Sequence, residues 1–200
     1  DLLPEAFALV REAGRRALKA GQPDKAGTAF RAAVEEAAGF PKGDARRAAA
    51  QAHLALALVR QDKRAGAEKA VAAAAAVYDP LPPDRATAAG QYALGLARVG
   101  VGRPAAGEAT LRKALAAEEQ AKDPNPAVLA ASLDGVAAAC EARGRYAEAV
   151  PLRARALELL ASAPPPEQAD AAARLARSLV RAGRPADAEP HLVRAAELTR

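Results

Sequence analysis

The side chains best suited to chemistry in this sequence are two histidines and one cysteine. His53 and His191 lie far apart, and neither has a second ligand at metal-binding spacing. A zinc site needs three or four convergent ligands. Cys140 lies four residues before Gly144, on the packed face of a predicted helix, with no basic residue patterned beside it. We therefore expect no metal site and an inert, structural thiol.

Two pairs of glutamates and one glycine-rich stretch are the remaining candidates. Glu35-Glu36 and Glu118-Glu119 are neighbours on predicted helices, so their side chains point in different directions. A solvated helix face explains them better than an acid–base pair. The stretch "GLARVGVG" at 95–102 has no strand before it, which a dinucleotide-binding loop requires. We expect no catalytic residue, no cofactor and no enzymatic activity.

The composition indicates a helical protein. The chain has 200 residues and is 51% hydrophobic, but aromatic residues are only 3% and isoleucine is absent. Alanine, the strongest helix former, supplies most of the apolar count. The net charge of +5 is spread without a polybasic arm, so we expect a solvated, arginine-rich surface and no nucleic acid partner.

The sequence shows no targeting or membrane segment. No apolar run approaches the roughly 20 residues of a membrane span, and no signal peptide is visible. A single cysteine rules out an internal disulfide. These features favour the cytoplasm. Because methionine is absent and the chain starts at Asp1, we expect an excerpt or a processed product.

A pattern of about 40 residues occurs five times, at start points 41, 40, 42 and 39 residues apart. Each copy has a small residue five positions after its start and alanine three positions after a larger side chain, as on one helix face. The start points are Gly21, Asp62, Gly102, Gly144 and Gly183. The alanines are Ala33, Ala74, Ala114, Ala156 and Ala195.

A second pattern precedes each start point. Seven residues upstream lies a small residue with a larger apolar one before it, as expected where two helices pack closely. The small residues are Gly14, Ala55, Gly95, Ala137 and Ala176. Each copy thus predicts a helix, a tight turn and a second helix, with proline-rich stops between copies. We expect one domain over 1–200, with repeats at about 1–40, 41–81, 82–123, 124–164 and 165–200.

These motifs resemble the tetratricopeptide repeat family. The stretch "SLDGVAAACEARGRYAEAVPLRARAL" at 132–157 is similar to the longer repeat of kinesin light chains. The resemblance implies an all-α fold, a right-handed solenoid of five helical hairpins with about ten helices. Two departures fall in this stretch. Asp134-Gly135 replaces the family's asparagine pair, and Arg153 replaces a large apolar residue.

The arginine at position 153 must be accommodated in an otherwise apolar position. We expect its aliphatic stem to pack while its guanidinium reaches solvent or an acidic partner. On this view the substitution Arg153→Leu is neutral or stabilising.

The resemblance also implies a concave groove that the first helix of each repeat lines. Carried over repeat by repeat, the groove residues are Arg11, Arg15, His53, Leu56, Tyr92, Leu96, Asp134, Ala138, Arg174 and Arg177. Such a groove is basic at both ends and apolar near its middle, which suits a peptide or partner helix with apolar and acidic residues. A carboxylate clamp is not supported, because the only asparagine is Asn125, in a linker.

Two functions fit the sequence. The first is a non-catalytic protein–protein interaction module, because nothing in the repeats supplies chemistry. The alternative is a regulatory or scaffolding segment of a larger enzyme, such as a bacterial kinase or protease. A nucleic-acid binder fits less well, since aromatic side chains for base stacking are scarce.

Overall fold

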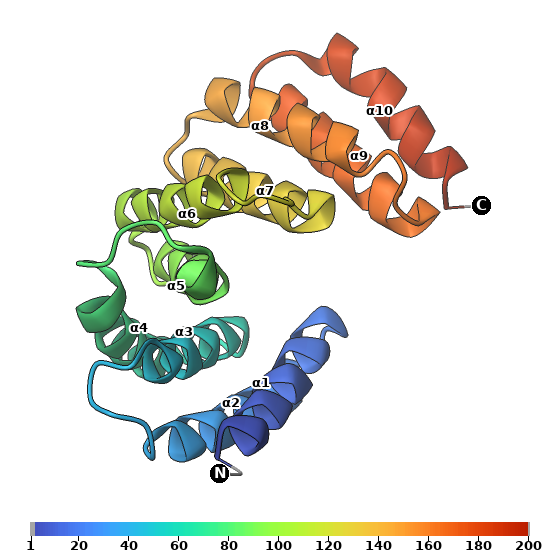
Figure 1. Ribbon diagram of the computed structural model, residues 1–200. Helices are drawn as coiled ribbons and strands as arrows, with labels where there is room; N and C mark the ends of the chain where they lie inside the picture. The colour runs from blue at the N-terminus through green and yellow to red at the C-terminus, as the bar shows by residue number, and fades with distance from the viewer. Residues whose placement is uncertain (1–2, 200) are drawn as a thin grey trace. The chain divides into compact units, whose positions relative to one another are not determined.

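The computed structural model describes residues 3–199, and over that range the chain forms ten α-helices and no strand (Figure 1). The helices are α1 (Leu3–Lys19), α2 (Pro23–Ala37), α3 (Ala45–Arg60), α4 (Arg64–Tyr78), α5 (Arg85–Gly100), α6 (Pro104–Glu119), α7 (Pro126–Ala142), α8 (Tyr146–Leu159), α9 (Pro165–Arg181) and α10 (Pro185–Glu197). The predicted all-α repeat fold is confirmed.

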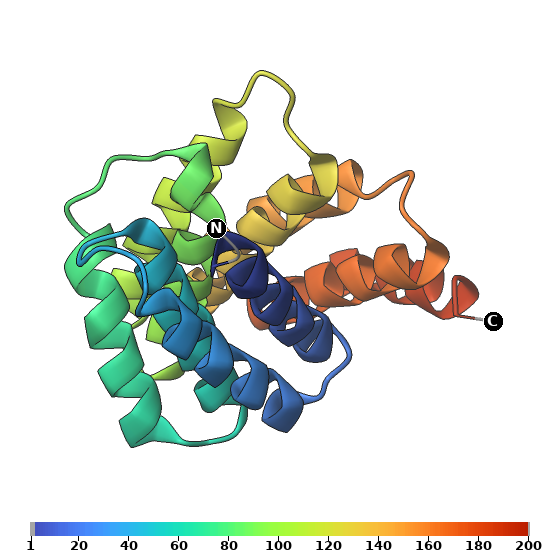
Figure 2. The same cartoon turned by 60° about the horizontal axis from the view of Figure 1, so that its bottom comes forward.

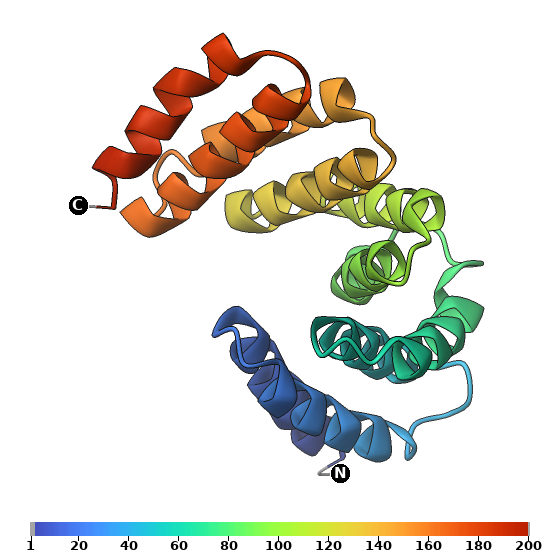
Figure 3. The same cartoon turned by 180° about the vertical axis from the view of Figure 1, so that it is seen from behind.

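The chain divides into two compact units, Asp1–Ala114 and Leu115–Arg200. We call them the first and the second unit. In the first, α1 lies beside α2 and α3 beside α4 (Figure 2), and α3 also packs on α2 and α5. In the second, α7 packs on α8, α8 on α9, and α9 on α10 (Figure 3). The expected single domain over 1–200 stays a prediction.

Every hairpin turn contains one residue with a positive φ, between 57° and 84°. Four of them are glycines, and the fifth is Asp62. The next residue donates its N–H to a carbonyl five residues earlier, as Lys63 does to Leu58 at 2.9 Å and Arg145 does to Cys140 at 2.9 Å. This bond closes the end of each first helix. The predicted turn at each start point is therefore present in all five hairpins.

The helices begin in two ways. After the linkers, Asp44, Asp84 and Asn125 cap α3, α5 and α7 by accepting backbone N–H groups with their side chains. After the turns, α2 and α10 start at a proline, whose missing N–H costs nothing in the first turn. Pro151 and Pro190 lie inside α8 and α10, and both helices continue through them.

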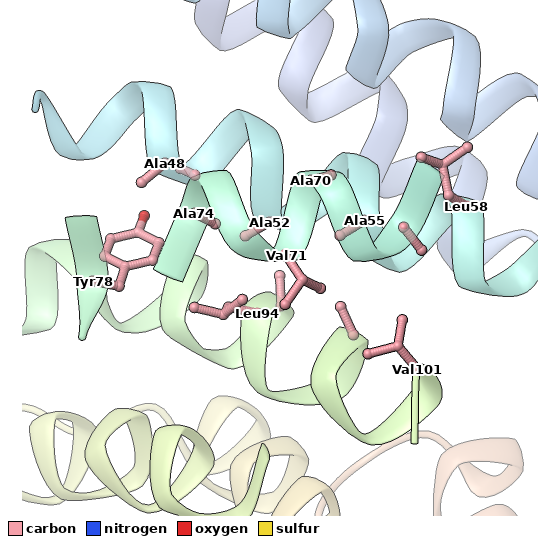
Figure 4. Packing of buried hydrophobic residues seen from close by; sticks show 14 residues of the cluster. Ala48, Ala52, Ala55, Leu58, Ala70, Val71, Ala74, Tyr78, Leu94 and Val101 are labelled. Atoms are coloured by element: carbon pink, nitrogen blue, oxygen red, sulfur yellow. The ribbon is translucent and has the colours of Figure 1, made fainter. Parts of the chain in front are cut away.

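Small residues let the helices of the first unit approach closely. A Cβ atom added at Gly14 would lie 2.5 Å from the Phe30 ring, and one added at Gly95 would lie 2.5 Å from Cγ of Leu111. Figure 4 shows the main core of this unit, in which Val71 of α4 packs with α3 and α5. The recurring small residue of the sequence pattern therefore lies at the helix–helix contacts.

The second unit uses alanine for the same purpose. Ala137 and Ala176 are both 0% exposed, so their predicted burial is confirmed. The last helix differs from the others, because Ala188 is the only residue of α10 that is buried. Its side chains Leu192 and Val193 are half-exposed. Helix α10 is thus covered on one side only within the described residues.

Candidate functional site

A network of charged side chains connects α7, α8 and α9 in the second unit. Arg153 of α8 donates a hydrogen bond to Asp134 of α7 at 2.8 Å, and its other terminal nitrogen lies 3.3 Å from Glu141. Asp134 also pairs with Arg174 of α9 at 3.0 Å. Two of the predicted groove residues, Asp134 and Arg174, are therefore brought together in the structure.

The network continues at both ends. Arg174 also pairs with Asp170 one turn earlier on α9, at 2.5 Å. The hydroxyl of Ser178 donates to Glu141 at 2.5 Å. Each buried charge thus has at least one partner of opposite sign or a hydroxyl, which a charge away from water requires.

The charged side chains surround a cavity of about 260 Å³. It is lined by Glu141, Arg153, Asp170, Arg174 and Arg177. The side chain of Arg177 is exposed and makes no ion pair or hydrogen bond with the other residues of the described chain. The cavity therefore combines paired charges with one cation that is available to a ligand.

Arg153 stays charged although it is buried. Burial disfavours the charged form, but the nearby carboxylates of Asp134 and then Glu141 outweigh it and raise the pKa of Arg153 above its ordinary value. Its Nε atom is buried and has no hydrogen-bond partner among the described residues.

The sequence contained a clue to this network that single-position reasoning missed. Asp134 and Arg153 were the two departures from the family pattern in the fourth repeat, and the structure shows that they are partners. Glu141, Asp170 and Ser178 were not predicted as site residues. The expectation that Arg153 reaches an acidic partner is confirmed.

In the first unit, His53 is an interior residue, 7% exposed. Its ring packs on Phe30 with centroids 5.2 Å apart, and its Nδ1 lies 2.8 Å from the carbonyl oxygen of Ala49. Burial lowers the pKa of His53, the Ala49 hydrogen bond opposes this, and the positive charges of Arg11 and Arg15 add to it; together they bring the pKa to about 4. A buried imidazole is not open to a partner in this structure.

The other predicted groove residues of the first unit are open to solvent to different degrees. Arg15 is exposed, while Arg11, Leu56, Tyr92 and Leu96 are half-buried. They lie on α1, α3 and α5, and α3 packs against both of the other two helices. In the second unit Ala138 is half-buried.

The remaining candidates for chemistry have structural surroundings. Cys140 is 0% exposed, as expected for a structural thiol, and His191 is half-buried. Glu119 is exposed and pairs with Arg155 at 2.6 Å, but Glu118 is 8% exposed. The expected solvated carboxylate is therefore wrong for Glu118, because its side chain lies on the packed side of α6.

Residues 3–199 contain neither a metal-binding cluster nor a membrane-spanning helix. Within this range no three histidine, cysteine, aspartate or glutamate side chains are grouped closely enough to hold a metal ion. None of the helices in the same range is long and apolar enough to cross a membrane.

Comparisons with known proteins identify the repeat. The sequence model of the tetratricopeptide repeat family matches residues 128–200. No curated protein matches the sequence significantly. Solved structures match nearly the whole chain. The kinesin light chain TPR-like repeats of Podosopora anserina have a TM-score of 0.70 at 21% identity, covering 98% of this chain and 96% of that one.

Two more structures have the same architecture. BtubC (BKLC) from P. vanneervenii has a TM-score of 0.69 at 16% identity, with 100% of this chain and 91% of that chain covered. MamA from Desulfovibrio magneticus RS-1 has a TM-score of 0.60 at 15% identity, with coverage of 98% and 96%. The chain thus has the tetratricopeptide repeat fold of kinesin light chain-like proteins, and its residues 128–200 carry the sequence pattern of that family.

Proposed function

We propose that the chain is a non-catalytic protein–protein interaction module that binds a peptide or partner helix on the faces of its first helices. In the second unit, this face includes the charged cavity between α7, α8 and α9. The observation that carries the proposal is the cavity itself, where Arg177 is exposed and unpaired beside side chains that are held in place by ion pairs.

The cavity supports binding better than it supports catalysis. Arg153 and Arg174 are each paired with carboxylates, so neither serves as a free acid or base. A partner's acidic side chain can pair with Arg177, and a rigid surrounding network lowers the entropy cost of that contact. The paired residues position the site, and Arg177 is the one that meets the ligand.

The first unit offers a different surface. Tyr92 and Leu96 lie one turn apart on α5, so they share a helix face, and both are half-buried. Partly exposed apolar side chains of this kind can hold an apolar anchor of a partner. Arg11 and Arg15 add positive charge from α1 and would attract acidic residues.

A location in the cytoplasm is part of this proposal. The single cysteine is a buried thiol that forms no disulfide, which is compatible with a reducing compartment.

The test for the second unit is affinity capture from native lysate with Arg177→Glu and a matched control, Lys122→Glu. Both side chains are exposed, neither makes an ion pair with the other described residues, and both variants change the charge equally. We expect the Arg177 variant to lose partners at least tenfold and the control to keep them. Equal capture by both variants would rule out the cavity as the binding site.

The test for the first unit uses apolar side chains. Tyr92→Ala with Leu96→Ala is compared with Val34→Ala and Leu81→Ala, which also trims two half-buried apolar residues of this unit. Capture is compared after thermal melting shows equal stability. Loss of partners only in the Tyr92/Leu96 double variant supports binding on the first helices of the repeats. Loss only in the Val34/Leu81 double variant contradicts it.

A further inference from the structure

The hairpin turns of the first unit carry an excess of positive charge on exposed side chains. Six cations lie in or next to the turns at 19–25, 60–64 and 101–103, with two aspartates between them. The cations are Lys19, Lys25, Arg60, Lys63, Arg64 and Arg103, and the aspartates are Asp24 and Asp62. All eight side chains are exposed. We call these eight residues the turn surface.

The three turns are joined to one another directly. The side chain of Gln61 in the middle turn donates to the Pro23 carbonyl at the start of α2, at 2.6 Å. Arg64 at the start of α4 donates to the Val101 carbonyl in the third turn, at 2.9 Å. The turn surface is therefore continuous, and the spacing between its charges is fixed by these contacts.

The backbone places equivalent side chains in a row. Gln22, Lys63 and Arg103 each follow the residue with positive φ, and their N–H groups donate to the carbonyls of Ala17, Leu58 and Arg98 at 2.8–2.9 Å. Because the three turns close in the same way, these side chains leave the backbone at equivalent positions. The repeat thus sets the order of the charges along the surface.

Some cations elsewhere in the first unit have structural partners. Arg98 pairs with Asp79 at 2.6 Å, Arg112 pairs with Glu108 at 3.0 Å, and Lys113 donates to the Asp79 carbonyl at 2.8 Å. By contrast, the side chains of Lys25, Arg60, Lys63 and Arg103 make no ion pair or hydrogen bond with other residues in the range 3–199. These four charges are available to another molecule.

The chemistry of the surface selects one kind of partner. Asp24 and Asp62 interrupt the row of cations, so a nucleic acid, which carries a phosphate on every nucleotide, cannot avoid them. A peptide can place its carboxylates opposite the cations and neutral residues opposite the aspartates. No exposed large apolar side chain belongs to the turn surface, so it has nothing to insert into a membrane.

We propose that the turn surface of the first unit binds an extended, glutamate- or aspartate-rich protein segment. This surface is separate in sequence from the cavity of the second unit and does not depend on it. The contact is made between exposed charges, so it is screened by salt and weakens as ionic strength rises.

The experiment uses the full chain and a fluorescein-labelled peptide of eight Glu-Gly repeats, followed by fluorescence anisotropy at 25 and 200 mM NaCl. The turn-surface variant carries Lys25→Gln, Arg60→Gln, Lys63→Gln and Arg103→Gln. The control carries Arg31→Gln, Lys42→Gln, Lys69→Gln and Lys122→Gln, four exposed cations outside the surface that likewise make no ion pair with the described residues. Both variants have the same net charge.

We expect the turn-surface variant to bind the peptide at least tenfold more weakly than the parent, and the control to differ from the parent by less than threefold. An equal loss in both variants would mean that net charge alone attracts the peptide, and the proposal would fail. Tighter binding of a 20-base-pair DNA duplex, or of vesicles with anionic lipid, through the same four cations would also overturn it. Because the four side chains are exposed, circular dichroism should show unchanged folding for both variants.

Discussion

The position three residues before the recurring alanine of each second helix is filled in opposite ways in the first unit and in α8 of the second unit. In the first unit it holds Phe30, Val71 and Leu111, which are at most 1% exposed and pack among apolar neighbours. In the second unit α8 holds Arg153 there, which is almost as buried, at 7%, but is surrounded by carboxylates, whereas α10 holds the half-exposed Leu192. The backbone of the repeat therefore accepts either an apolar or an ionic side chain here.

The difference lies in what surrounds the side chain. An apolar residue fills its space and leaves no polar atom without a partner. An arginine needs partners on several sides, and here they come from α7 directly and from α9 through Asp134. Ion pairs pack less tightly than methyl groups, and a cavity lies beside this network. The buried arginine and its carboxylate partners therefore give up some apolar packing, and they line a cavity that a ligand can enter.

The largest expected change in stability comes from a substitution in the first unit, where this position is apolar. Phe30 is 0% exposed and contacts the His53 ring, so Phe30→Ala should lower the free energy of unfolding by about 4 kcal/mol. Urea titration followed by circular dichroism measures this change. A loss under about 1 kcal/mol would mean that the apolar core is looser than the structure shows.

The second expected change is a dependence of the free energy of unfolding on pH. His53 has a pKa of about 4 when folded and about 6.5 when unfolded, so the unfolded chain binds the proton more readily. Stability is therefore complete above pH 6.5 and falls as the pH drops towards 4, by up to about 3 kcal/mol. Urea titrations of the parent and His53→Leu at several pH values measure it. Unchanged pH dependence in the variant would assign the effect to other groups.

The third effect tests how closely the helices approach in the second unit. Ala137 and Ala176 have no exposed surface, so Ala137→Leu or Ala176→Leu should destabilise by about 2 kcal/mol through overpacking. Thermal melting of each variant gives the result. Two variants that melt at the parent's temperature would contradict the observed contacts.

The smallest expected change in stability comes from replacing the buried arginine at position 153 with an apolar residue. The structure revises the expectation that Arg153→Leu is neutral or stabilising, because the variant leaves Glu141 and Asp134 without one partner each. Since Asp134 keeps Arg174 and Glu141 keeps Ser178, the loss should be modest, about 1 kcal/mol. Adding Asp134→Asn and Glu141→Gln should restore stability. If it does not, the arginine stabilises the unit by packing and not by charge.

Much of the fold could be predicted from the sequence because the repeat is a local pattern. The turn glycines and the small residues at Gly14, Gly95, Ala137 and Ala176 each act within one hairpin, and all are found where expected. The periodicity of one helix is enough to assign its packed face. The helix order and the hairpins followed from this alone.

The candidate site was harder to predict because it depends on pairs. Assigning a groove phase repeat by repeat selected Arg174 and Arg177, which line one cavity, and Asp134, which pairs with Arg174, but it treated Arg153 as an isolated exception. His53 shows the reverse error of such reasoning, since a position on a first helix can face the core when a large ring such as Phe30 lies opposite. Whether such a side chain is exposed or buried depends on the size and charge of the side chains that face it from neighbouring helices. The sequence of a single repeat does not contain this information.

The one-sided cover of α10 has a consequence for motion. A helix is held in place by the apolar area that it buries, and in α10 only Ala188 is fully enclosed. Separating this helix from α9 would expose little apolar surface of α10 itself, which lowers the free energy of local opening there. The amide hydrogens of α10 should therefore exchange with solvent sooner than those of α7, whose core residues include Leu133 and Val136.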